Sequence, residues 1–445
     1  MSISGMWIGV PRFSANLREL SRKDGGHIMT LFVHAADIHL DSPLKGLYQD
    51  ESAPDAEEIR SAARAAFDKL VDLVLSEGAP LLIIAGDLYD GGWKDFSTGL
   101  YFASRMRKLA EEGVRVAVVR GNHDAENRMT KSLVMPENVK IFSSRKPETW
   151  ILEDLNMALH GQSYPRRDVT ENLALDYPEP VPGMLNIGIL HCLISGAEGH
   201  LPYAPCTSDQ LAAKGYDYWA LGHVHELAVV RKTPPIVYPG CIQGRHIRET
   251  GEKGCALVER EEDGLSVEFV PLDVLRWMAV ETDAAGAESV DRVVSIFGDV
   301  FEGRIADLDG RLCCARVKIT GCCPVHGRLL ADPDTVVANI KAMAAEVSGG
   351  RAWIEKVEIR TAPEIDLAQL AESDTPQGEL LRYMGEIESC ENPFELLNAD
   401  FSSLKAKLAG TDVSVPEDDA AQLLRDARDI LLTMLADMES REERS

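Results

Sequence analysis

The stretch Leu31-Phe-Val-His-Ala-Ala-Asp-Ile-His39 joins a short apolar run to an acid and a histidine that follow it directly. Similar apolar runs recur along the chain and alternate with stretches of helical period. Such runs are typical of strands buried on both faces, and their alternation with helices indicates a layered α/β domain. The spacing shortens after residue 185, which predicts a second, mixed sheet packed on the first. We expect strands at Leu31–Ala35, Leu81–Ala85, Val114–Val119, Met157–His160, Leu185–Leu190, Tyr218–Leu221, Ile236–Tyr238, Ala256–Glu259 and Ser266–Val270, and helices near Asp55–Ser76 and Thr98–Glu112.

Four parts are expected along the chain. Residues 1–28 have no clear period and form a disordered leader, with Met29 as an alternative start. Residues 29–275 form the large α/β domain, and a boundary falls near 272–280. Residues 276–364 form a small α/β domain, and residues 365–445 form an acidic helical segment. Within the small domain we expect strands at Leu312–Thr320 and Ala352–Arg360 and a helix at Asp334–Glu346.

The composition is that of a globular protein, with 45% apolar and 27% charged residues. No apolar run approaches the roughly 20 residues that span a bilayer, and no signal peptide is recognisable, so no membrane is expected. Nine cysteines without a regular framework suit a reducing compartment, and we expect a cytoplasmic protein. The net charge is −26, and residues 361–445, with 20 acidic and 7 basic side chains, carry −13 of it. Such an acidic segment repels phosphate backbones and suits a protein partner.

Five short motifs follow predicted strands, and the ends of strands in an α/β sheet converge on one crevice. Together they would gather three carboxylates, one amide and five imidazoles. This mixture of oxygen and nitrogen donors suits Mn, Fe or Zn, and one shared carboxylate would divide it into two adjacent sites. Glycines before three of the motifs allow sharp turns at the sheet edge. The motifs are Asp37-Ile-His39, Gly86-Asp87, Gly121-Asn-His-Asp124, His191 and Gly222-His-Val-His225.

This ordered set resembles the calcineurin-like metallophosphoesterase superfamily, whose fold is a two-sheet sandwich flanked by helices. The resemblance covers about residues 29–271. Three stretches are similar to the DNA repair exonuclease branch of the SbcD and YhaO type. Residues 276–364 would then be a capping domain that touches DNA. The stretches are Ala36-Asp-Ile-His-Leu-Asp-Ser-Pro-Leu-Lys-Gly46, Tyr238-Pro-Gly-Cys-Ile-Gln-Gly-Arg-His246 and Glu249-Thr-Gly-Glu-Lys-Gly254.

The resemblance implies a role for each motif residue. A hydroxide that bridges two divalent ions, Mn²⁺ first with Fe or Zn as alternatives, would attack the phosphorus of a DNA phosphodiester. His123 would contact the phosphate and protonate the leaving oxygen, and Asp124 would orient its ring. Asp37, His39 and His225 would hold the first ion, Asn122, His191 and His223 the second, and Asp87 both.

One position departs from the repair nucleases, which often carry a second histidine three residues after the bridging aspartate. Here that position is Asp90, whose charge would repel a phosphate. Arg245 and His246 could supply the missing positive contact to the substrate. The alternative is that residues 243–246 form a structural turn beside the site.

The same resemblance implies DNA as substrate, an SMC-like coiled-coil ATPase as partner and a homodimer through helices of the catalytic domain. Residues 423–438 carry an apolar stripe that would either complete its own domain or dock on that ATPase. Two other functions stay open. One is a phosphoesterase for nucleotides, cyclic nucleotides or phosphoproteins, and the other is a scaffold subunit with weak catalysis.

Two cysteine pairs, Cys313-Cys314 and Cys322-Cys323, could indicate a zinc cluster. Neighbouring residues on a strand point to opposite faces, however, so one pair cannot easily chelate one ion. Buried free thiols are the favoured interpretation.

Overall fold

The computed structural model describes residues 29–42, 56–90, 96–126, 134–194, 203–261, 264–364, 367–389 and 420–442. The expected leader at 1–28 therefore lies outside the described residues. The chain forms two compact units, residues 1–278 and 279–445. Among the described helices, none has the length and apolar character needed to cross a membrane.

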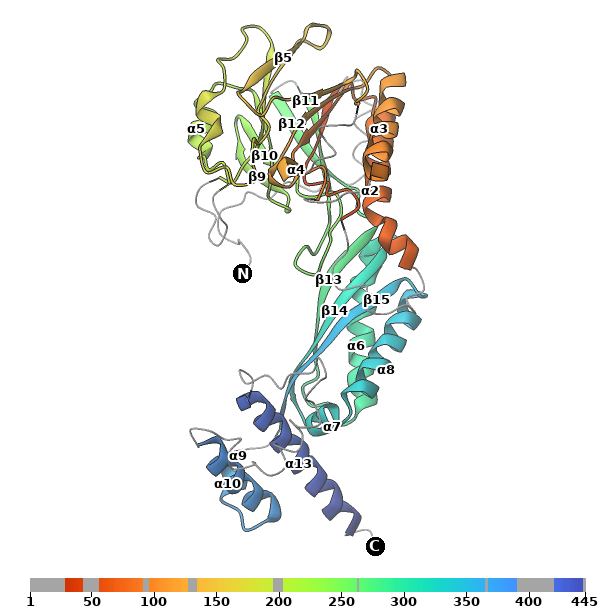
Figure 1. Ribbon diagram of the computed structural model, residues 1–445. Helices are drawn as coiled ribbons and strands as arrows, with labels where there is room; N and C mark the ends of the chain where they lie inside the picture. The colour runs from red at the N-terminus through yellow and green to blue at the C-terminus, as the bar shows by residue number, and fades with distance from the viewer. Residues whose placement is uncertain are drawn as a thin grey trace. The chain divides into compact units, whose positions relative to one another are not determined.

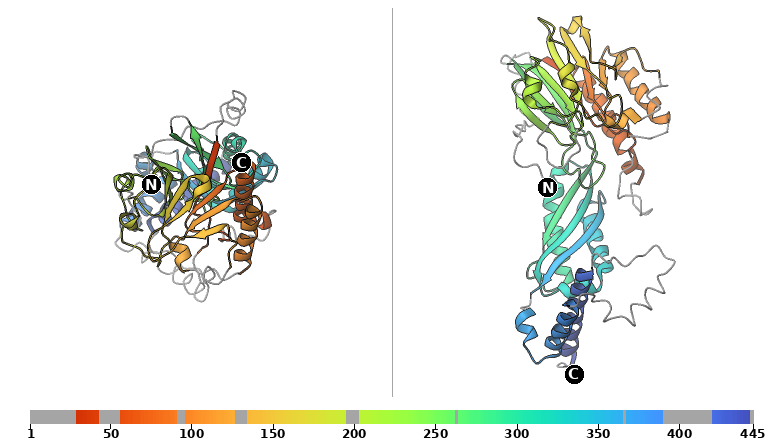
Figure 2. Two further views of the ribbon diagram at one scale, coloured as in Figure 1. Left: turned by 90° about the horizontal axis from the view of Figure 1, so that it is seen from above. Right: turned by 60° about the vertical axis from the view of Figure 1, so that its left-hand side comes forward.

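The first unit contains two six-stranded sheets packed face to face (Figure 1). The first sheet has the order β12-β11-β1-β2-β3-β4, in which β1 to β4 run parallel and β11 pairs antiparallel with both β1 and β12. Helices α2 and α3 lie on its outer face, which Figure 2 shows from above. The elements are β1 (Met29–Ala35), α2 (Ala56–Ser76), β2 (Leu81–Ala85), α3 (Phe96–Glu111), β3 (Arg115–Val119), α4 (Asn122–Glu126), β4 (Val139–Ile141), β11 (Gly254–Glu261) and β12 (Gly264–Pro271).

The second sheet has the order β5-β6-β7-β8-β10-β9, and its four central strands run parallel. Its outer face is covered by α5 and by loops that contribute aromatic side chains such as Tyr164 and Tyr177. The elements are β5 (Glu148–Leu152), β6 (Met157–Gly161), β7 (Leu185–His191), α5 (Ser208–Ala212), β8 (Tyr218–Gly222), β9 (Ala228–Lys232) and β10 (Pro235–Tyr238).

The strands of the first unit are apolar on both sides because each sheet packs against two neighbours. In β2, Leu81 and Ile83 face the other sheet, whereas Leu82 and Ile84 face α2 and α3. Two-sided burial removes the polar alternation of a surface strand. The expected α/β sandwich is confirmed.

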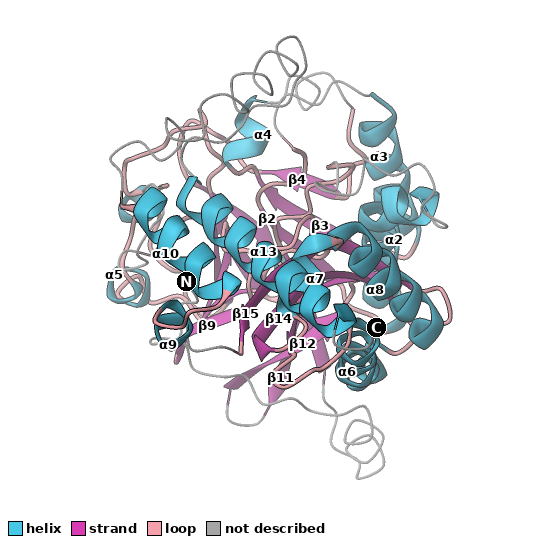
Figure 3. Cartoon of the chain, turned by 90° about the horizontal axis from the view of Figure 1, so that it is seen from below, coloured by secondary structure: helices cyan, strands magenta, loops and turns pink. Residues whose placement is uncertain are grey.

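The second unit contains a sheet of the order β13-β14-β15, in which β14 and β15 run parallel. Helices α6 and α8 pack together, and α8 packs on β15 (Figure 3). Strand β13, which had no counterpart among the expected strands, lies at the expected boundary of the two domains. The elements are β13 (Leu275–Asp283), α6 (Val290–Ile305), β14 (Leu312–Cys323), α7 (His326–Ala331), α8 (Pro333–Ser348) and β15 (Ala352–Pro363).

Three further helices are described in the second unit: α9 (Leu367–Ala371), α10 (Pro376–Glu388) and α13 (Ala420–Glu442). Helix α13 packs on α7 and α10. His326 on α7 contacts Asp429 on α13 over 3.1 Å, and both are buried. A methyl group on Gly327 would lie 1.6 Å from Thr433 Oγ1, so the two helices meet almost backbone to backbone.

Candidate metal centre

The motif residues lie together at one edge of the two sheets of the first unit. The neighbouring parallel strands β1, β2 and β3 end at or near Ala35, Ile84 and Val119. The motifs that carry the acids and the amide follow these strand ends. In the other sheet His191 pairs with Gly222 at the ends of β7 and β8. The expected convergence of distant strand ends is therefore what the structure contains.

Three of the side chains expected at the first ion form one compact group. Asp37, His39 and His225 place potential ligand atoms within 4.8 Å of one another. The Asp37 carboxylate accepts the backbone N–H of His223 at 2.9 Å and lies 3.7 Å from His225 Nε2. Asp37 and His39 both have positive φ angles, 49° and 45°. This unusual backbone turns both side chains back over the sheet edge.

His39 is the strongest sign that this group holds a cation. Its ring is fully buried, and neither ring nitrogen has a hydrogen-bond partner. Burial lowers the pKa of His39 to about 3, so the imidazole is neutral, the form that binds metals. A buried unpaired nitrogen is costly unless an ion or water completes it. Two buried carboxylates nearby, Asp37 and Asp87, make a divalent ion the fitting partner.

A second group surrounds His191. Its ring Nδ1–H donates to the carbonyl of Ala85 at 3.0 Å, which leaves Nε2 as the free nitrogen. That nitrogen lies 2.9 Å from Asn122 Oδ1 and 3.5 Å from Asp87 Oδ2. Three electron-rich atoms that face one another need a cation among them. Although burial opposes it, the Asp87 and Asp37 carboxylates raise the pKa of His191 to about 9, so in the absence of metal a proton takes this place. His223 stands beside His191, with ring centroids 5.2 Å apart.

Asp87 stands between the two groups. Its Oδ2 is 3.9 Å from His39 Nε2 and 3.5 Å from His191 Nε2, and its Oδ1 accepts the backbone N–H of His123. Against the effect of burial, His191 holds the pKa of Asp87 well below its usual range. A carboxylate that is ionised and flanked by two imidazoles fits a ligand shared by two ions.

His123 meets Asp90 rather than Asp124, and the expected role of Asp124 is corrected. His123 Nδ1 is 2.8 Å from Asp90 Oδ1, and this contact raises the pKa of His123. Asp124 is instead buried and accepts the backbone N–H groups of Leu88, Tyr89 and Gly121. It fixes the backbone that carries Asp87 and Asn122, and the sequence offered no sign of those three bonds.

Asp90 likewise differs from its expected effect on a phosphate. Its carboxylate accepts the His123 ring N–H and the hydroxyl of Ser42, and His39 Nδ1 is 3.7 Å away. The hydrogen bond from His123 is the main cause that holds the pKa of Asp90 far below its usual range. Its charge is therefore directed at the imidazoles that surround it.

The glycines of the motifs are required mainly because neighbouring backbone and ligand side chains lie very close to them, and less because the chain turns there. A Cβ on Gly222 would lie 1.9 Å from the Ala85 carbonyl oxygen, and one on Gly121 would lie 2.3 Å from Asp87 Oδ1. Of the three expected turns, only Gly86 has a positive φ, 99°. The sheets approach so closely here that side chains at these positions would occupy the space of the ligands.

Two family models match the chain. Residues 30–227 match calcineurin-like phosphoesterases, and residues 277–362 match the middle domain of metallophosphoesterase YhaO. The uncharacterized metallophosphoesterase YhaO of Bacillus subtilis is 35% identical over 345 residues, which cover 76% of this chain and 84% of that protein. The chain belongs to the YhaO family of calcineurin-like metallophosphoesterases.

More distant relatives of this YhaO-family chain include DNA double-strand break repair proteins. Mre11 of Methanopyrus kandleri is 27% identical over 276 residues, which cover 56% of this chain and 58% of that protein. Among solved structures, a dimetal phosphatase from Danio rerio covers 55% of the chain at 13% identity, with a TM-score of 0.31. That score is too low to carry an argument. Family membership makes the chain a metal-binding phosphoesterase, and the donor groups described above fit two divalent ions.

Arg245 and His246 belong to a layer behind the ligands. The Arg245 guanidinium bonds Glu249 at 2.9 Å and faces His225 Nδ1 at 3.2 Å. His246 Nε2 lies 3.6 Å from the same Glu249 carboxylate. These contacts place both side chains beside the first donor group, and the contact to the substrate stays a prediction. Glu249 itself had no expected role, although it opens one of the stretches that carried the resemblance.

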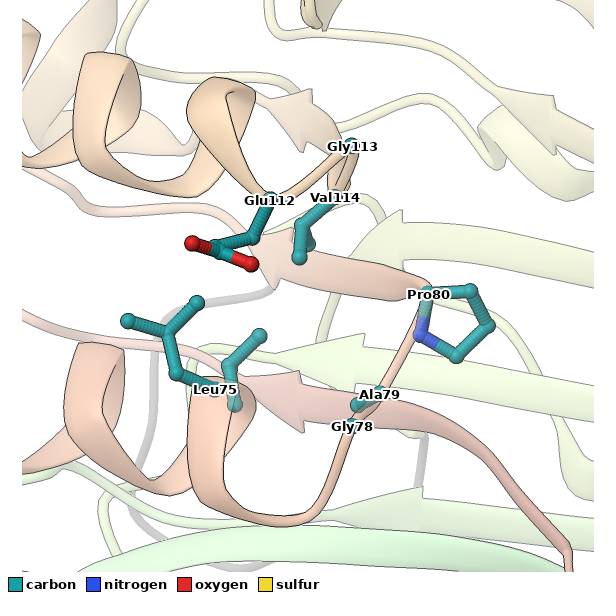
Figure 4. Close-up of a pocket in the computed structure, with 8 residues that line it drawn as sticks. Leu75, Gly78, Ala79, Pro80, Glu112, Gly113 and Val114 are labelled. Carbon is teal, nitrogen blue, oxygen red and sulfur yellow. The ribbon is translucent and has the colours of Figure 1, made fainter.

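Other features of the described residues stay outside the centre. His34 Nδ1 meets the Tyr218 hydroxyl at 3.1 Å, and His160 meets Asn186 and Thr149, so both histidines contact core residues away from the centre. Cys313, Cys314 and Cys323 are buried as expected, whereas Cys322 is exposed, and none of the four forms a disulfide. No metal-binding group found among the described residues includes any of them. A cavity of about 360 Å³ lies at the opposite ends of β2 and β3, where Glu112 is the one charged lining residue (Figure 4).

Proposed function

We propose that this YhaO-family chain hydrolyses DNA phosphodiester bonds with two divalent metal ions, and that Mn²⁺ is the preferred metal. The observation that carries the proposal is the pair of donor groups joined through buried Asp87, with His123 beside them. The similarity to Mre11 repair proteins supports DNA as the substrate class. The mixture of carboxylate, amide and imidazole donors suits Mn²⁺.

In the proposed enzyme some of the ligands are held by the protein before metal enters. Asp37, His39 and His225 would hold the first ion, and Asn122, His191 and His223 the second, with Asp87 shared. A hydrogen bond to the Ala85 carbonyl orients the His191 ring, and a hydrogen bond from the His223 backbone N–H orients the Asp37 carboxylate. When bound, the two ions supply neutralisation of the phosphate charge and a water of lowered pKa.

His123 would act as the general acid. Its Nδ1–H points to Asp90, so Nε2 is the atom free to give a proton to the leaving oxygen. Asp90 favours the protonated ring, since its carboxylate raises the pKa of His123. Asp124 would act on the backbone alone, by fixing the turn between Asp87 and Asn122.

The test is hydrolysis by purified chain loaded with Mn²⁺. Labelled duplex DNA, single-stranded DNA, cyclic nucleotides and a generic phosphodiester are compared under the same conditions. The proposal expects DNA cleavage that EDTA abolishes and that His223→Ala or His225→Ala removes with the fold intact. Hydrolysis of the small esters alone would establish the nucleotide phosphoesterase instead. A chain that binds no metal and cleaves nothing would establish the scaffold subunit.

A partner surface is proposed on α13, because that helix has two apolar faces. Leu424 and Leu432 are buried within the second unit, whereas Leu431 and Met434 are 40% and 55% exposed. The buried face completes its own domain, and the exposed face is left for the coiled-coil ATPase. Met434→Glu should abolish co-purification with such an ATPase and leave thermal stability unchanged. The homodimer stays a prediction that would use exposed Phe96 and Leu100 on α3.

A further inference from the structure

Glu249 contacts His225 but is a member of neither of the two donor groups described above. Its Oε1 lies 2.7 Å from His225 Nδ1, and the side chain of Glu249 is 6% exposed. Residue 249 lies in the chain between β10 and β11, 24 positions after the histidine. The contact is therefore made by the fold and not by local sequence.

This contact decides which nitrogen of His225 is free. A carboxylate only accepts hydrogen bonds, so the 2.7 Å contact with Glu249 Oε1 places the proton on Nδ1. The Arg245 guanidinium, which only donates, lies farther from Nδ1, at 3.2 Å, and gives its N–H to Glu249 Oε1 at 2.9 Å. Nε2 therefore keeps its lone pair. Nε2 is the nitrogen that lies 3.7 Å from Asp37. Without Glu249 both tautomers would be available, and the ring could turn away from Asp37. The contact thus selects the form of His225 that can bind a metal.

Glu249 cannot easily leave this position, because Arg245 holds both of its oxygens. The guanidinium donates to Oε1 at 2.9 Å, and the backbone N–H of Arg245 donates to Oε2 at 2.7 Å. The side chain of Arg245 is 14% exposed. A carboxylate fixed at both oxygens in a nearly dry position gives a rigid support for the imidazole.

The backbone of His225 is held from the same segment. Lys253, which is buried, donates to the carbonyl oxygen of His225 at 3.1 Å, and the thiol of Cys241 faces that oxygen at 3.6 Å. The side chain and the main chain of His225 are thus fixed by different residues. His225, Cys241 and Glu249 also place ligand atoms within 4.8 Å of one another. In the structure, however, the Cys241 thiol faces the His225 carbonyl and Glu249 faces Nδ1, so these contacts support His225 itself.

We propose that Glu249 is a positioning residue that orients His225 and thereby sets the affinity of the first metal ion. The inference rests on the proposed two-metal function, but it concerns metal binding and holds for any phosphoester substrate. Partners of this kind behind a metal ligand typically change metal affinity by about 10–100-fold when removed.

The test is a titration of metal-free protein with Mn²⁺, in which calorimetry and electron paramagnetic resonance measure the binding. Glu249→Ala should weaken one of two Mn²⁺ sites by about 10–100-fold and leave the other unchanged. Glu226→Gln is the matched control, because it removes an exposed acid next to His225 and should leave both affinities unchanged. In a His225→Ala chain, Glu249→Ala should cause no further loss at the first site, since the residue acts through the histidine.

A second measurement keeps the inference testable if Glu249→Ala folds poorly. Nitrogen-15 spectra of histidine in metal-free protein should show His225 protonated at Nδ1, and Glu249→Gln should shift that tautomer balance. Equal Mn²⁺ affinities in Glu249→Ala and unaltered protein would overturn the inference. So would an equal loss in Cys241→Ser, because Glu249 and Cys241 would then be ligands themselves. Absence of Mn²⁺ binding to the unaltered chain would instead contradict the proposed function.

Discussion

Asp90 lies beside two imidazoles with different proposed roles, His123 as the general acid and His39 as a metal ligand. One carboxylate oxygen receives the His123 ring N–H, and His39 Nδ1 lies 3.7 Å from the same oxygen. Ser42 donates its hydroxyl to the other oxygen at 2.7 Å. Rotation of this carboxylate would therefore disturb the proposed acid and a proposed metal ligand together. Asp90 thus positions both rings in addition to supplying negative charge.

Asp90→Asn should lower kcat about tenfold or more for substrates with a poor alkoxide leaving group. Without the carboxylate the pKa of His123 falls, and fewer molecules hold the proton that the leaving oxygen needs. A p-nitrophenyl ester needs little protonation, so its kcat should change much less. Steady-state rates for both substrates test this, with Ser42→Ala as the milder control. Equal losses for the two leaving groups would argue that Asp90 serves the metal ligands alone.

At this scale the sequence predicted which residues converge but not how each is held. The order of acids, amide and histidines after strands identified Asp37, Asp87 and His191, because strand ends must share an edge. The bond between Glu249 and His225 depends on a loop that returns after two further strands, which no local pattern reveals. Asp124 was misassigned because adjacency to His123 in the chain does not imply contact in a turn.

Among the elements, the junction of β8 with the first sheet leaves no room for a side chain. Gly222→Ala would set a methyl group 1.9 Å from the Ala85 carbonyl oxygen and 2.9 Å from His191 Nδ1. We expect a loss of several kcal/mol in the free energy of unfolding, of the kind that overpacking causes, and loss of the second metal ion. Urea denaturation and metal analysis measure the two effects.

Gly303→Ala is the control for that substitution. Gly303 lies within α6, and no atom lies within 4 Å of an added Cβ. Alanine favours a helix over glycine, so this change should stabilise by up to about 1 kcal/mol. If Gly222→Ala were equally harmless, the close approach of the two sheets at the metal centre would be wrong.

Helix α13 is anchored by a polar contact in a buried place. Asp429→Ala would leave His326 Nε2 without its partner, and a buried unsatisfied group costs about 1–3 kcal/mol. The same change removes the bond from Arg428 to Asp429. Chemical denaturation should show this loss, whereas exposed Met434→Ala should change stability little. Equal stability of the two variants would mean that α13 is not anchored by this contact.

The elements were predictable where their periodicity was clean. The expected strand at 81–85 was confirmed to the residue, because two-sided burial makes it a continuous apolar run. By contrast β13 alternates buried and exposed residues only in its second half, as in Val280 and Glu281, and this run is short for a period of two to be recognised. The apolar stripe on α13 is divided in the structure, since Leu424 and Leu432 are buried whereas Leu431 and Met434 are exposed. Sequence period marks apolar faces, but it does not state which face is covered.

For the whole molecule, the net charge of −26 sets a condition on DNA binding. Cations on the described sheet of the second unit are engaged by acids: Arg316 bonds Glu355 at 2.7 Å, and Lys318 lies 3.5 Å from Glu281. Paired side chains of this kind release few counterions from a phosphate backbone. In the proposed function, attraction for the scissile phosphate therefore comes chiefly from the metal ions and their surroundings.

The division into two compact units predicts two thermal transitions, of which metal should move one. All seven proposed ligands belong to residues 1–278. A ligand that binds only the folded form stabilises it by about 2.7 kcal/mol at 100 times its dissociation constant. Calorimetry with Mn²⁺ should raise the transition of the first unit, and Asp429→Ala should lower the other. If Mn²⁺ raises both transitions together, the two units do not unfold independently.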